Sequence, residues 1–256
     1  MKITVLGCSG GIGKGYRTTC YQVDDDLLID CGSGLGELPL ERLRGIRHVF
    51  LTHSHLDHIA FLPFLVDTVF EELTRHPLTV YLLRETLETL RKHVFNWSIW
   101  PDFAKLPDED NPVLRFRVIE RDEVVEVAGR RIHAIPVSHT VAALGYRVEA
   151  PSGKSFAYTG DSTSNDGFWD ALNAQGRLDR LFAECSFPDR EKQIARQAGH
   201  YHSSLLAKDL AKLKIEPEIA ITHLTPSMGS EIMGELRALM PDTPLTALKR
   251  GDVFDL

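Results

Sequence analysis

The sequence predicts a layered α/β fold in which one domain spans residues 1–256. Short apolar, β-prone runs alternate with stretches of helical spacing in both halves of the chain, as in sheets covered by helices. A length of 256 residues allows one large domain or two small ones. No break in composition, low-complexity linker or internal repeat divides the chain, so we expect a single domain.

The individual elements follow from periodicity and turn signals. In the first half we expect strands at 2–6, 19–23, 27–29, 49–52 and 78–82, and helices at 57–75 and 85–93. In the second half we expect strands at 114–119, 123–127, 130–137, 144–149, 155–159, 179–183 and 218–221. An amphipathic helix is expected over 203–213, with Ser203 or Ser204 as its N-cap.

Composition and charge narrow the class of protein. The hydrophobic share of 43% and the charged share of 25% are ordinary for a globular protein. A net charge of −7 gives no basic footprint for nucleic acid and argues against an anionic membrane. No apolar run approaches the roughly 20 residues of a membrane span. The start, MKITVLGCSG, is expected to be a strand, not a signal peptide.

The number and spacing of the cysteines indicate the cellular compartment in which the protein is expected. The chain has four of them, and they form no C-x-x-C pair. A reduced protein located in the cytoplasm fits this pattern better than a disulfide framework does. A thiolate metal site is not expected either. The four residues are Cys8, Cys20, Cys31 and Cys185.

The stretch LTHSHLDHIA at 51–60 groups potential metal ligands directly after an apolar strand. His53 and His55 are two residues apart, so in an extended segment they project to the same side. Asp57 and His58 follow where a helix would begin. Such adjacent nitrogen and oxygen donors suit two divalent ions. Chance crowding of histidines in a surface loop is the weaker interpretation.

Three further candidates stand at the ends of predicted strands. His139 occurs in AIPVSHT, Asp161 in FAYTGDS and His223 in IAITHLT. Each follows an apolar β-type run and precedes a turn signal. Singly, each would be read as a satisfied polar residue at a strand end. Because they share the context of the first cluster, we expect them to converge with it at one edge of the sheets.

The order H-x-H-x-D-H, then a lone His, an Asp in a TGD turn and a final His resembles the metallo-β-lactamase superfamily over residues 53–223. The resemblance implies an αββα four-layer sandwich and a site for two metal ions. His55, where redox members of the superfamily often carry Glu, favours hydrolysis. The implied ligands are His53, His55 and His139 for the first ion, Asp57, His58 and His223 for the second, and Asp161 as the bridge.

Other stretches narrow the resemblance within the superfamily. Similarity to class II cyclic-nucleotide phosphodiesterases is carried by LGCSGG and TTC (6–11, 18–20), LLIDCGSGLG (27–36), LTHSHLDHI (51–59), HVFNWSIWPDF (93–103) and FAECSF (182–187). Phe61 departs from that pattern, since a small residue is usual there. The second half also resembles ribonuclease Z, whose paired Glu and His segments are similar to AEC around Glu184 and HSS from His202.

The implied function is hydrolysis of a small phosphodiester, with a 3′,5′-cyclic nucleotide as the favoured substrate, by a metal-bridging hydroxide. Zn²⁺ is the first candidate ion, with Mn²⁺ or Fe²⁺ as alternatives. The expected catalytic set is Asp57, His202 and Glu184: His202, oriented by Glu184, would protonate the leaving group. His200 is the alternative acid, and a capping or surface role for both histidines is the other reading.

Three other functions stay open at this point. A ribonuclease Z-like RNA-processing endonuclease is disfavoured by the acidic charge and by the lack of an evident Gly/Lys-rich arm. Another ester or thioester hydrolase can use the same fold. A metal-bound scaffold without activity is disfavoured because every ligand is present. We expect a small-molecule partner and no membrane partner, while the oligomeric state, including a homodimer, is left open.

Two segments need separate interpretation. GCSGGIGKG (7–15) fails the Walker A pattern, and Ser9 in GCSGG cannot begin the helix that a nucleophile elbow requires. Its glycines are expected to form a turn close to the site. The segment 93–112 holds two tryptophans among three prolines. It is expected to be either a flap or interface, or a loop that buries both tryptophans in the core.

Overall fold

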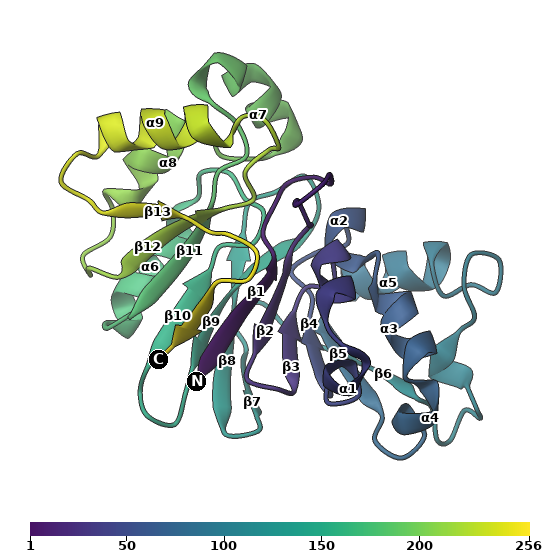
Figure 1. The fold of residues 1–256 in the computed structure, drawn as a ribbon. Helices are drawn as coiled ribbons and strands as arrows, with labels where there is room; N and C mark the ends of the chain where they lie inside the picture. Colours follow the sequence, from purple (N-terminus) through teal and green to yellow (C-terminus); the bar gives the residue numbers. More distant parts are fainter.

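The computed structural model describes all residues from 1 to 256 and contains two seven-stranded sheets packed against each other (Figure 1). The first sheet has the spatial order β14 (Val253–Asp255), β1 (Lys2–Gly7), β2 (Cys20–Val23), β3 (Leu27–Ile29), β4 (His48–Phe50), β5 (Leu78–Leu82) and β6 (Leu114–Val118). The second has the order β13 (Leu245–Ala247), β12 (Glu218–Thr222), β11 (Arg180–Glu184), β10 (Ser155–Tyr158), β9 (Ala143–Glu149), β8 (Arg130–Val137) and β7 (Val124–Val127).

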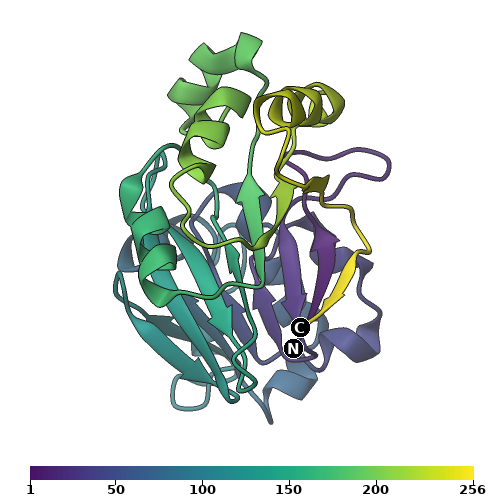
Figure 2. The same ribbon diagram turned by 90° about the vertical axis from the view of Figure 1, so that its left-hand side faces the viewer.

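Helices cover the outer face of each sheet, which confirms the expected αββα order of layers (Figures 1 and 2). On the first sheet lie α1 (Leu40–Leu43), α2 (Leu56–Ile59), α3 (Leu62–Thr68), α4 (Phe70–Leu73) and α5 (Arg84–His93). On the second lie α6 (Asp166–Gln175), α8 (Ser203–Leu210) and α9 (Gly229–Leu239), with α7 (Lys192–Ala198) beyond the end of β11. None of these helices combines the length and the apolar character that crossing a membrane requires.

The central strands are buried on both faces, so successive residues belong to different cores. In β4, Val49 packs with the helices outside the first sheet, whereas Phe50 packs between the two sheets. In β5, Val80 likewise packs with the outer helices and Tyr81 between the two sheets. The rings of Phe50 and Tyr81 stack with centroids 4.2 Å apart. This two-sided burial explains why these strands are continuous apolar runs in the sequence.

The directions of the strands bring several chain segments to one edge of the molecule. In the first sheet β3, β4, β5 and β6 pair in parallel. In the second, β10, β11, β12 and β13 do so, and β8 has the same direction because β8 and β10 both pair antiparallel with β9. The chain therefore leaves β4, β8, β10, β11 and β12 at corresponding ends. Whatever follows these strands can meet there.

The predicted strands are confirmed: β3, β5 and β8 match without any shift, and the others are shifted by one or two residues at their ends. The continuous helix expected over 57–75 is wrong, because α2, α3 and α4 share this stretch. Pro63 has no N–H to continue the helical bonds across the first break. The N–H of Phe61 is bound by the carbonyl of Cys31 instead. The helix expected over 203–213 ends at Leu210.

A buried arginine joins the two sheets at the end remote from the clustered ligands. The Arg130 guanidinium is only 4% exposed and lies 3.0 Å from Asp24 and 2.6 Å from Asp26, in the turn between β2 and β3. Removing one partner of a buried ion pair leaves the other charges without compensation. Because both aspartates are partly exposed, we expect Arg130→Met to lower the free energy of unfolding by about 1–3 kcal/mol.

Urea denaturation measures this effect. Arg131→Met is the matched control, since Arg131 is the next residue and its side chain is 58% exposed. Its effect is expected to stay within about 0.5 kcal/mol, as for most surface substitutions. Equal losses in the two variants would show that Arg130 does not hold the sheets together through its ion pairs.

Candidate metal centre

Four chain segments bring seven histidine and aspartate side chains together where the strands end. All seven are the ligands expected from the sequence, and the structure places them in one cluster. Three strand ends of the second sheet and one of the first contribute. The residues are His53, His55, Asp57 and His58 after β4, His139 after β8, Asp161 after β10 and His223 after β12.

The seven side chains form two adjoining groups. In each group the potential ligand atoms all lie within 4.8 Å of one another. Asp161 reaches both groups, because its Oδ2 is 3.1 Å from Nε2 of His58 and 3.3 Å from Nε2 of His223. The same oxygen is 3.8 Å from Nε2 of His53. The first group is His53, His55 and His139, and the second is Asp57, His58, Asp161 and His223.

Four of the imidazoles are each held through Nδ1 by an acceptor outside the cluster. An Nδ1–H donated to such an acceptor leaves Nε2 with a free lone pair directed into the centre, and this is how metal-binding histidines are oriented. The pairs are His53 with Thr52 Oγ at 3.0 Å, His58 with Asp30 Oδ2 at 2.7 Å, His139 with the Gly199 carbonyl at 2.8 Å, and His223 with Ser186 Oγ at 2.9 Å.

Asp30 contacts the candidate centre and was not predicted from the sequence. It is fully buried directly after β3 and accepts hydrogen bonds from His58 Nδ1, from the Thr52 N–H at 2.8 Å and from the Thr52 hydroxyl. Burial raises the pKa of Asp30, against the opposing effects of His58 and Thr52. One signal was present in the sequence: this acid stands directly after the apolar strand of residues 27–29, and Asp161 likewise stands just past the end of an apolar strand.

We expect Asp30→Asn to weaken metal binding by roughly 10–100-fold, the usual effect of losing a partner of a metal-binding histidine. The amide keeps the volume of the side chain but offers no negative charge to the Nδ1–H of His58. Calorimetric titration of the metal-free chain with Zn²⁺ measures the affinity. Asp25→Asn, in the exposed turn after β2, is the control. Equal affinities in wild type and both variants would remove Asp30 from this role.

The first group of ligands favours neutral imidazoles. Burial lowers the pKa of all three of its histidines, most strongly for His53, which has almost no access to water. A neutral imidazole is the form that binds a metal ion. This group is therefore ready for a cation at neutral pH without losing protons. Its members are His53, His55 and His139.

The second group contains a tight set of opposite charges. Burial alone would lower the pKa of His58, but the carboxylates of Asp161 and Asp30 raise it well above its ordinary value. Burial would raise the pKa of Asp161, yet the neighbouring His223 and His58 hold it well below its usual range. The same two histidines keep the pKa of Asp57 low through hydrogen bonds, against its burial. Two ionised carboxylates at one point favour a cation there.

Two buried atoms in the centre have no hydrogen-bond partner, namely His53 Nε2 and Asp161 Oδ1. A buried polar atom left unpaired costs about 1–3 kcal/mol. A divalent cation would coordinate both atoms, so the residues present fit such an ion. Imidazole nitrogen with carboxylate oxygen is a donor set that accepts Zn²⁺, Mn²⁺ or Fe²⁺.

The expected pair of Glu184 and His202 does not form, and this prediction is wrong. Glu184, the last residue of β11, lies with Oε1 2.9 Å from Nδ1 of His200, the alternative named from the sequence. The ring of His200 is 5.0 Å from that of His139 and 5.3 Å from that of His223, centroid to centroid. His200 is therefore the histidine that Glu184 brings to the metal centre.

His202 has a structural position instead. It is the N-cap residue of α8, and its Nδ1 lies 2.7 Å from Oδ1 of Asp189. The same oxygen accepts the N–H of Ser204 at 2.8 Å and so caps the helix. Burial opposes ionisation of Asp189, but the hydrogen bonds from Ser204 and His202 lower its pKa. The capping interpretation of His202 matches this geometry.

The pair of Glu184 and His200 is charged and connected to the metal ligands. Burial alone would lower the pKa of His200, but Glu184 raises it to about 9. Ser186 Oγ donates to Glu184 Oε2 at 3.2 Å and lies 2.9 Å from Nδ1 of His223. A single hydroxyl thus joins the protonated histidine to a ligand of the second group.

The glycine-rich segment 7–15 is a turn beside the centre, as expected. It leads into β2 and not into a helix, and the hydroxyl of Ser9 donates to the carbonyl of Leu224 at 3.3 Å. Gly10 passes very close to His223: a Cβ at this position would lie 2.9 Å from the His223 carbonyl oxygen and 3.0 Å from its Nδ1. Only glycine allows this approach.

Phe61, where the sequence departs from the phosphodiesterase pattern, has its own packing site. A Cβ on Gly36 would lie 3.0 Å from its ring, so the glycine makes room for it. The ring centroid of Phe61 is 5.7 Å from that of Phe64. The larger residue is therefore accommodated by packing with these two neighbours.

The segment 93–112 combines both interpretations drawn from the sequence. Phe95 and Phe103 are buried among the helices outside the first sheet, and the Trp100 ring packs 5.1 Å from that of Phe64. Trp97 is 60% exposed, so the idea that the loop buries both tryptophans is wrong for this residue. The segment is anchored in the core but presents one large aromatic side chain to solvent.

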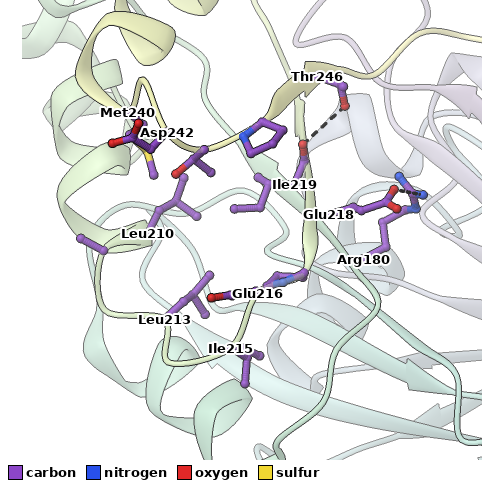
Figure 3. Close-up of a pocket in the computed structure, with 14 residues that line it drawn as sticks. Arg180, Leu210, Leu213, Ile215, Glu216, Glu218, Ile219, Met240, Asp242 and Thr246 are labelled. Atoms are coloured by element: carbon purple, nitrogen blue, oxygen red, sulfur yellow. Dashed lines mark hydrogen bonds and ion pairs between the residues drawn. The ribbon is translucent and has the colours of Figure 1, made fainter.

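A cavity of about 780 Å³ lies elsewhere (Figure 3). Its lining includes Glu218 and Ile219 at the beginning of β12, with Leu210 and Met240 from the ends of α8 and α9. His223 follows the other end of β12. At about 3.3 Å per residue, the cavity and the metal centre are separated by the length of the strand. The convergence of ligand atoms, and not cavity size, identifies the candidate active site.

Comparison with known proteins relates this centre to a family. Residues 26–224 match the family model described as a beta-lactamase superfamily domain. A probable 3′,5′-cyclic-nucleotide phosphodiesterase of Yersinia pestis is 24% identical, covering 88% of this chain and 78% of its own. A ribonuclease Z of Haloarcula marismortui is 22% identical, covering 93% and 91%. The structure of unliganded yeast PDE1 has the same fold, with a TM-score of 0.85 at 20% identity over 100% and 99% of the two chains.

Proposed function

The chain belongs to the β-lactamase superfamily and is a metallo-hydrolase of that fold, and from this premise we propose that it is a phosphodiesterase acting on small phosphodiesters. A 3′,5′-cyclic nucleotide is the favoured substrate. The observation that carries the proposal is the convergence of two adjoining ligand groups on Asp161. Relatives named as cyclic-nucleotide phosphodiesterases support the substrate class.

We assign one ligand group to each of two divalent ions. Asp161 is assigned to both ions because its carboxylate is within reach of both groups. When bound, such ions would polarise the phosphoryl oxygens and lower the pKa of an attacking water. The assigned ligands are His53, His55 and His139 for one ion and Asp57, His58 and His223 for the other.

His200 is assigned as the acid that donates a proton to the leaving oxygen. Its Nδ1 is bound by Glu184, which leaves Nε2 to face a substrate. A pKa of about 9 keeps this imidazole protonated at neutral pH. Glu184 is a positioning residue, since it acts through His200. Ser186 links this pair to His223 and keeps the acid and the second ligand group in a fixed relation.

Asp57 is assigned to orient the attacking water. Its side chain is 32% exposed, whereas that of Asp161 is almost completely buried. Its Oδ2 lies 3.2 Å from Nε2 of His223. The carboxylate therefore borders both the ligand group and the solvent, where it can accept a hydrogen bond from the water that enters.

A second candidate is an RNA-processing endonuclease of the ribonuclease Z type. It is favoured by a relative of that name that this chain matches over 91% of that relative's length. It is also favoured by the Glu–His pair that the resemblance to ribonuclease Z led us to expect, now formed by Glu184 and His200. Hydrolysis of another ester or of a thioester is compatible with the same fold.

A substrate panel separates these candidates. The purified chain is stripped of metal, reconstituted with Zn²⁺, Mn²⁺ or Fe²⁺, and given cyclic AMP, cyclic GMP, 2′,3′-cyclic nucleotides, a precursor tRNA and a thioester. We expect the highest kcat/KM on a 3′,5′-cyclic nucleotide and none in the metal-free control. Cleavage of the tRNA alone would select the second candidate. Full metal content without turnover of any substrate would indicate a scaffold.

A further inference from the structure

Two adjoining cavities lie next to the metal centre. Both are lined by Leu224, the residue that follows the candidate ligand His223. Their volumes are about 250 and 500 Å³. They share the side chains of Tyr16, Leu224 and Lys249, so they form one continuous depression. We call it the basic groove and define it by Tyr16, Arg17, Leu224, Arg237, Lys249 and Arg250.

The basic groove is positively charged although the chain carries a net charge of −7. Four cations line it, and no aspartate or glutamate does. Arg17 and Arg250 share one carboxylate, that of Glu37, at 2.6 and 2.7 Å. Arg237 and Lys249 form no ion pair at all. Four cations against one shared carboxylate leave three positive charges at the groove.

Three acidic side chains near the groove in the sequence bind other partners. Asp252 accepts the backbone N–H of Lys249 at 2.8 Å. On α9, Glu231 is bound by Arg190 at 2.9 Å, and Glu235 accepts the backbone N–H of Asp189. Neither these side chains nor Asp252 line the groove. None of these three carboxylates forms an ion pair with a cation of the groove, so Arg237 and Lys249 remain free to bind an anionic ligand.

An aromatic ring is held at the wall of the groove. Tyr16 is 46% exposed at the tip of the glycine-rich loop, which is closed by a hydrogen bond from its N–H to the Gly13 carbonyl at 3.1 Å. Gly15 takes φ +87°, which favours glycine, and Arg17 Nη1 donates to the carbonyls of Gly13 and Tyr16. An exposed ring beside unpaired cations is the combination that binds a nucleotide, through base stacking and phosphate pairing.

The basic groove and the metal centre are immediate neighbours. Leu224 lines the groove, and the preceding residue is the candidate ligand His223. The carbonyl of Leu224 binds the N–H of Gly10 at 3.1 Å, so the same loop borders both sites. Figure 2 shows this purple loop beside α9 and the yellow C-terminal segment that carries Lys249 and Arg250. A phosphodiester at the centre can extend into the groove.

We propose that the basic groove binds a second phosphate group of the substrate, one nucleotide away from the phosphodiester that is cleaved. Lys249 and Arg237 pair with this phosphate, and its nucleoside lies against Tyr16. The inference rests on the proposed phosphodiesterase function and extends its substrate class to short nucleotides that carry a terminal phosphate. A cyclic mononucleotide fills only the metal centre.

The test compares the dinucleotide ApA with its 5′-phosphorylated and 3′-phosphorylated forms, pApA and ApAp, on the metal-loaded full chain. We expect kcat/KM to be about tenfold higher for one phosphorylated form than for ApA, as for other charge-assisted phosphate contacts. This ratio should fall to about one in the double variant Lys249→Ala/Arg237→Ala. The control is Lys92→Ala/Arg115→Ala, which removes two cations without ion pairs from α5 and β6 and should keep the wild-type ratio.

Each result has a definite meaning. A wild-type ratio near one, or a preference that persists in the groove variant, would overturn the inference while phosphodiester hydrolysis itself still supports the proposed function. Faster hydrolysis of ApA on addition of free AMP, lost in the groove variant, would assign the groove to a separate nucleotide and overturn its role in substrate binding. Loss of any such preference above about 0.5 M salt supports an ionic contact.

A direct binding measurement keeps the two proposals apart. If no phosphodiester is hydrolysed, the proposed function fails, and the groove is tested with fluorescently labelled pApA and the metal-free chain. Affinity that is at least several-fold weaker in the groove variant than in the control supports the inference. Equal affinity in the two variants overturns it.

Discussion

Replacement of Asp161 by Asn is expected to lower kcat by at least about 10⁴-fold, a loss typical of removing a group on which several catalytic elements depend. One carboxylate oxygen of Asp161 is within 3.1–3.8 Å of three imidazole nitrogens that belong to both ligand groups. Its other oxygen is buried and unpaired. An amide keeps the volume but cannot bind two cations, so both the metal content and the rate should fall.

Metal analysis and turnover of bis(p-nitrophenyl) phosphate measure the two effects of this substitution. Asp166→Asn is the matched control, because Asp166 lies only five residues later and is exposed at the start of α6. It should keep two ions and the wild-type rate. An Asp161→Asn variant with two ions per chain and an unchanged kcat would contradict the assignment of Asp161 to both ligand groups.

Substitution of His200 and of His202, which are two residues apart, is expected to have different effects. His200→Ala is expected to lower kcat by about 10²–10⁴-fold with full metal content, because it removes the proposed proton donor. His202→Ala should leave kcat within a few-fold of wild type. It should instead lower the free energy of unfolding by about 1–2 kcal/mol, since it removes a hydrogen bond to the carboxylate that caps α8.

Stopped-time assays at saturating substrate and urea titrations of both variants give these values, and wild-type chain purified alongside is the reference. The reverse outcome would restore His202 as the acid: full activity in His200→Ala together with a large loss of kcat in His202→Ala. Loss of metal from the His200→Ala variant would indicate that His200 is itself a ligand. This outcome is compatible with the structure, because potential ligand atoms of His200, His139 and Asp161 lie within 4.8 Å of one another.

The pH dependence of kcat tests the link between Glu184 and His200. The carboxylate raises the pKa of His200 to about 9, so the acid stays protonated, and kcat is maintained, up to an alkaline pH. Glu184→Gln removes the charge that raises this pKa. The alkaline limb of the profile should therefore move to lower pH in the variant, while KM changes little. Bound cations shift the pH profiles of wild type and variant alike, so the quantity to measure is the difference between the two profiles. Identical profiles would exclude Glu184 as the positioning residue.

The clustering of the candidate ligands could be predicted from sequence because of a simple rule of sheet architecture. An apolar strand followed by a polar residue and a turn places that residue at a strand end, and strand ends of the same direction meet. His139, Asp161 and His223 all satisfy this rule. The four ligands of residues 53–58 follow a strand in the same way. The clustering could be predicted without knowing the direction of each strand or which strands are neighbours.

Other features depend on contacts that a linear pattern does not contain. Asp30 stands at a strand end, but its link to the centre is evident only from its hydrogen bond to His58, 28 residues later. The choice between His200 and His202 depends on the path of the chain after α7, where Gly199 takes φ +71° and the chain at His202 then pairs with Phe187. Which of two nearby histidines meets Glu184 is fixed by this path and not by spacing.

The basic groove could not be predicted from the sequence for a related reason. Its cations stand at 17, 237, 249 and 250, and a net charge of −7 over the whole chain gives no sign that they gather. The break between α2 and α3 was also missed, although Pro63 marks it, because the helical spacing of apolar residues continues across the break. Net charge and periodicity are averages, and both conceal local exceptions.

The origin of the ligands in both sheets has a consequence for the lifetime of the protein. β4 belongs to the first sheet, and β8, β10 and β12 belong to the second. A cation that binds only the native chain adds about 4 kcal/mol of stability at a thousand times its dissociation constant. Because the candidate ligands come from both sheets, a bound ion would link the two sheets across the middle of the molecule. Metal supply would then regulate how long the chain survives proteases, independently of how fast it turns over substrate.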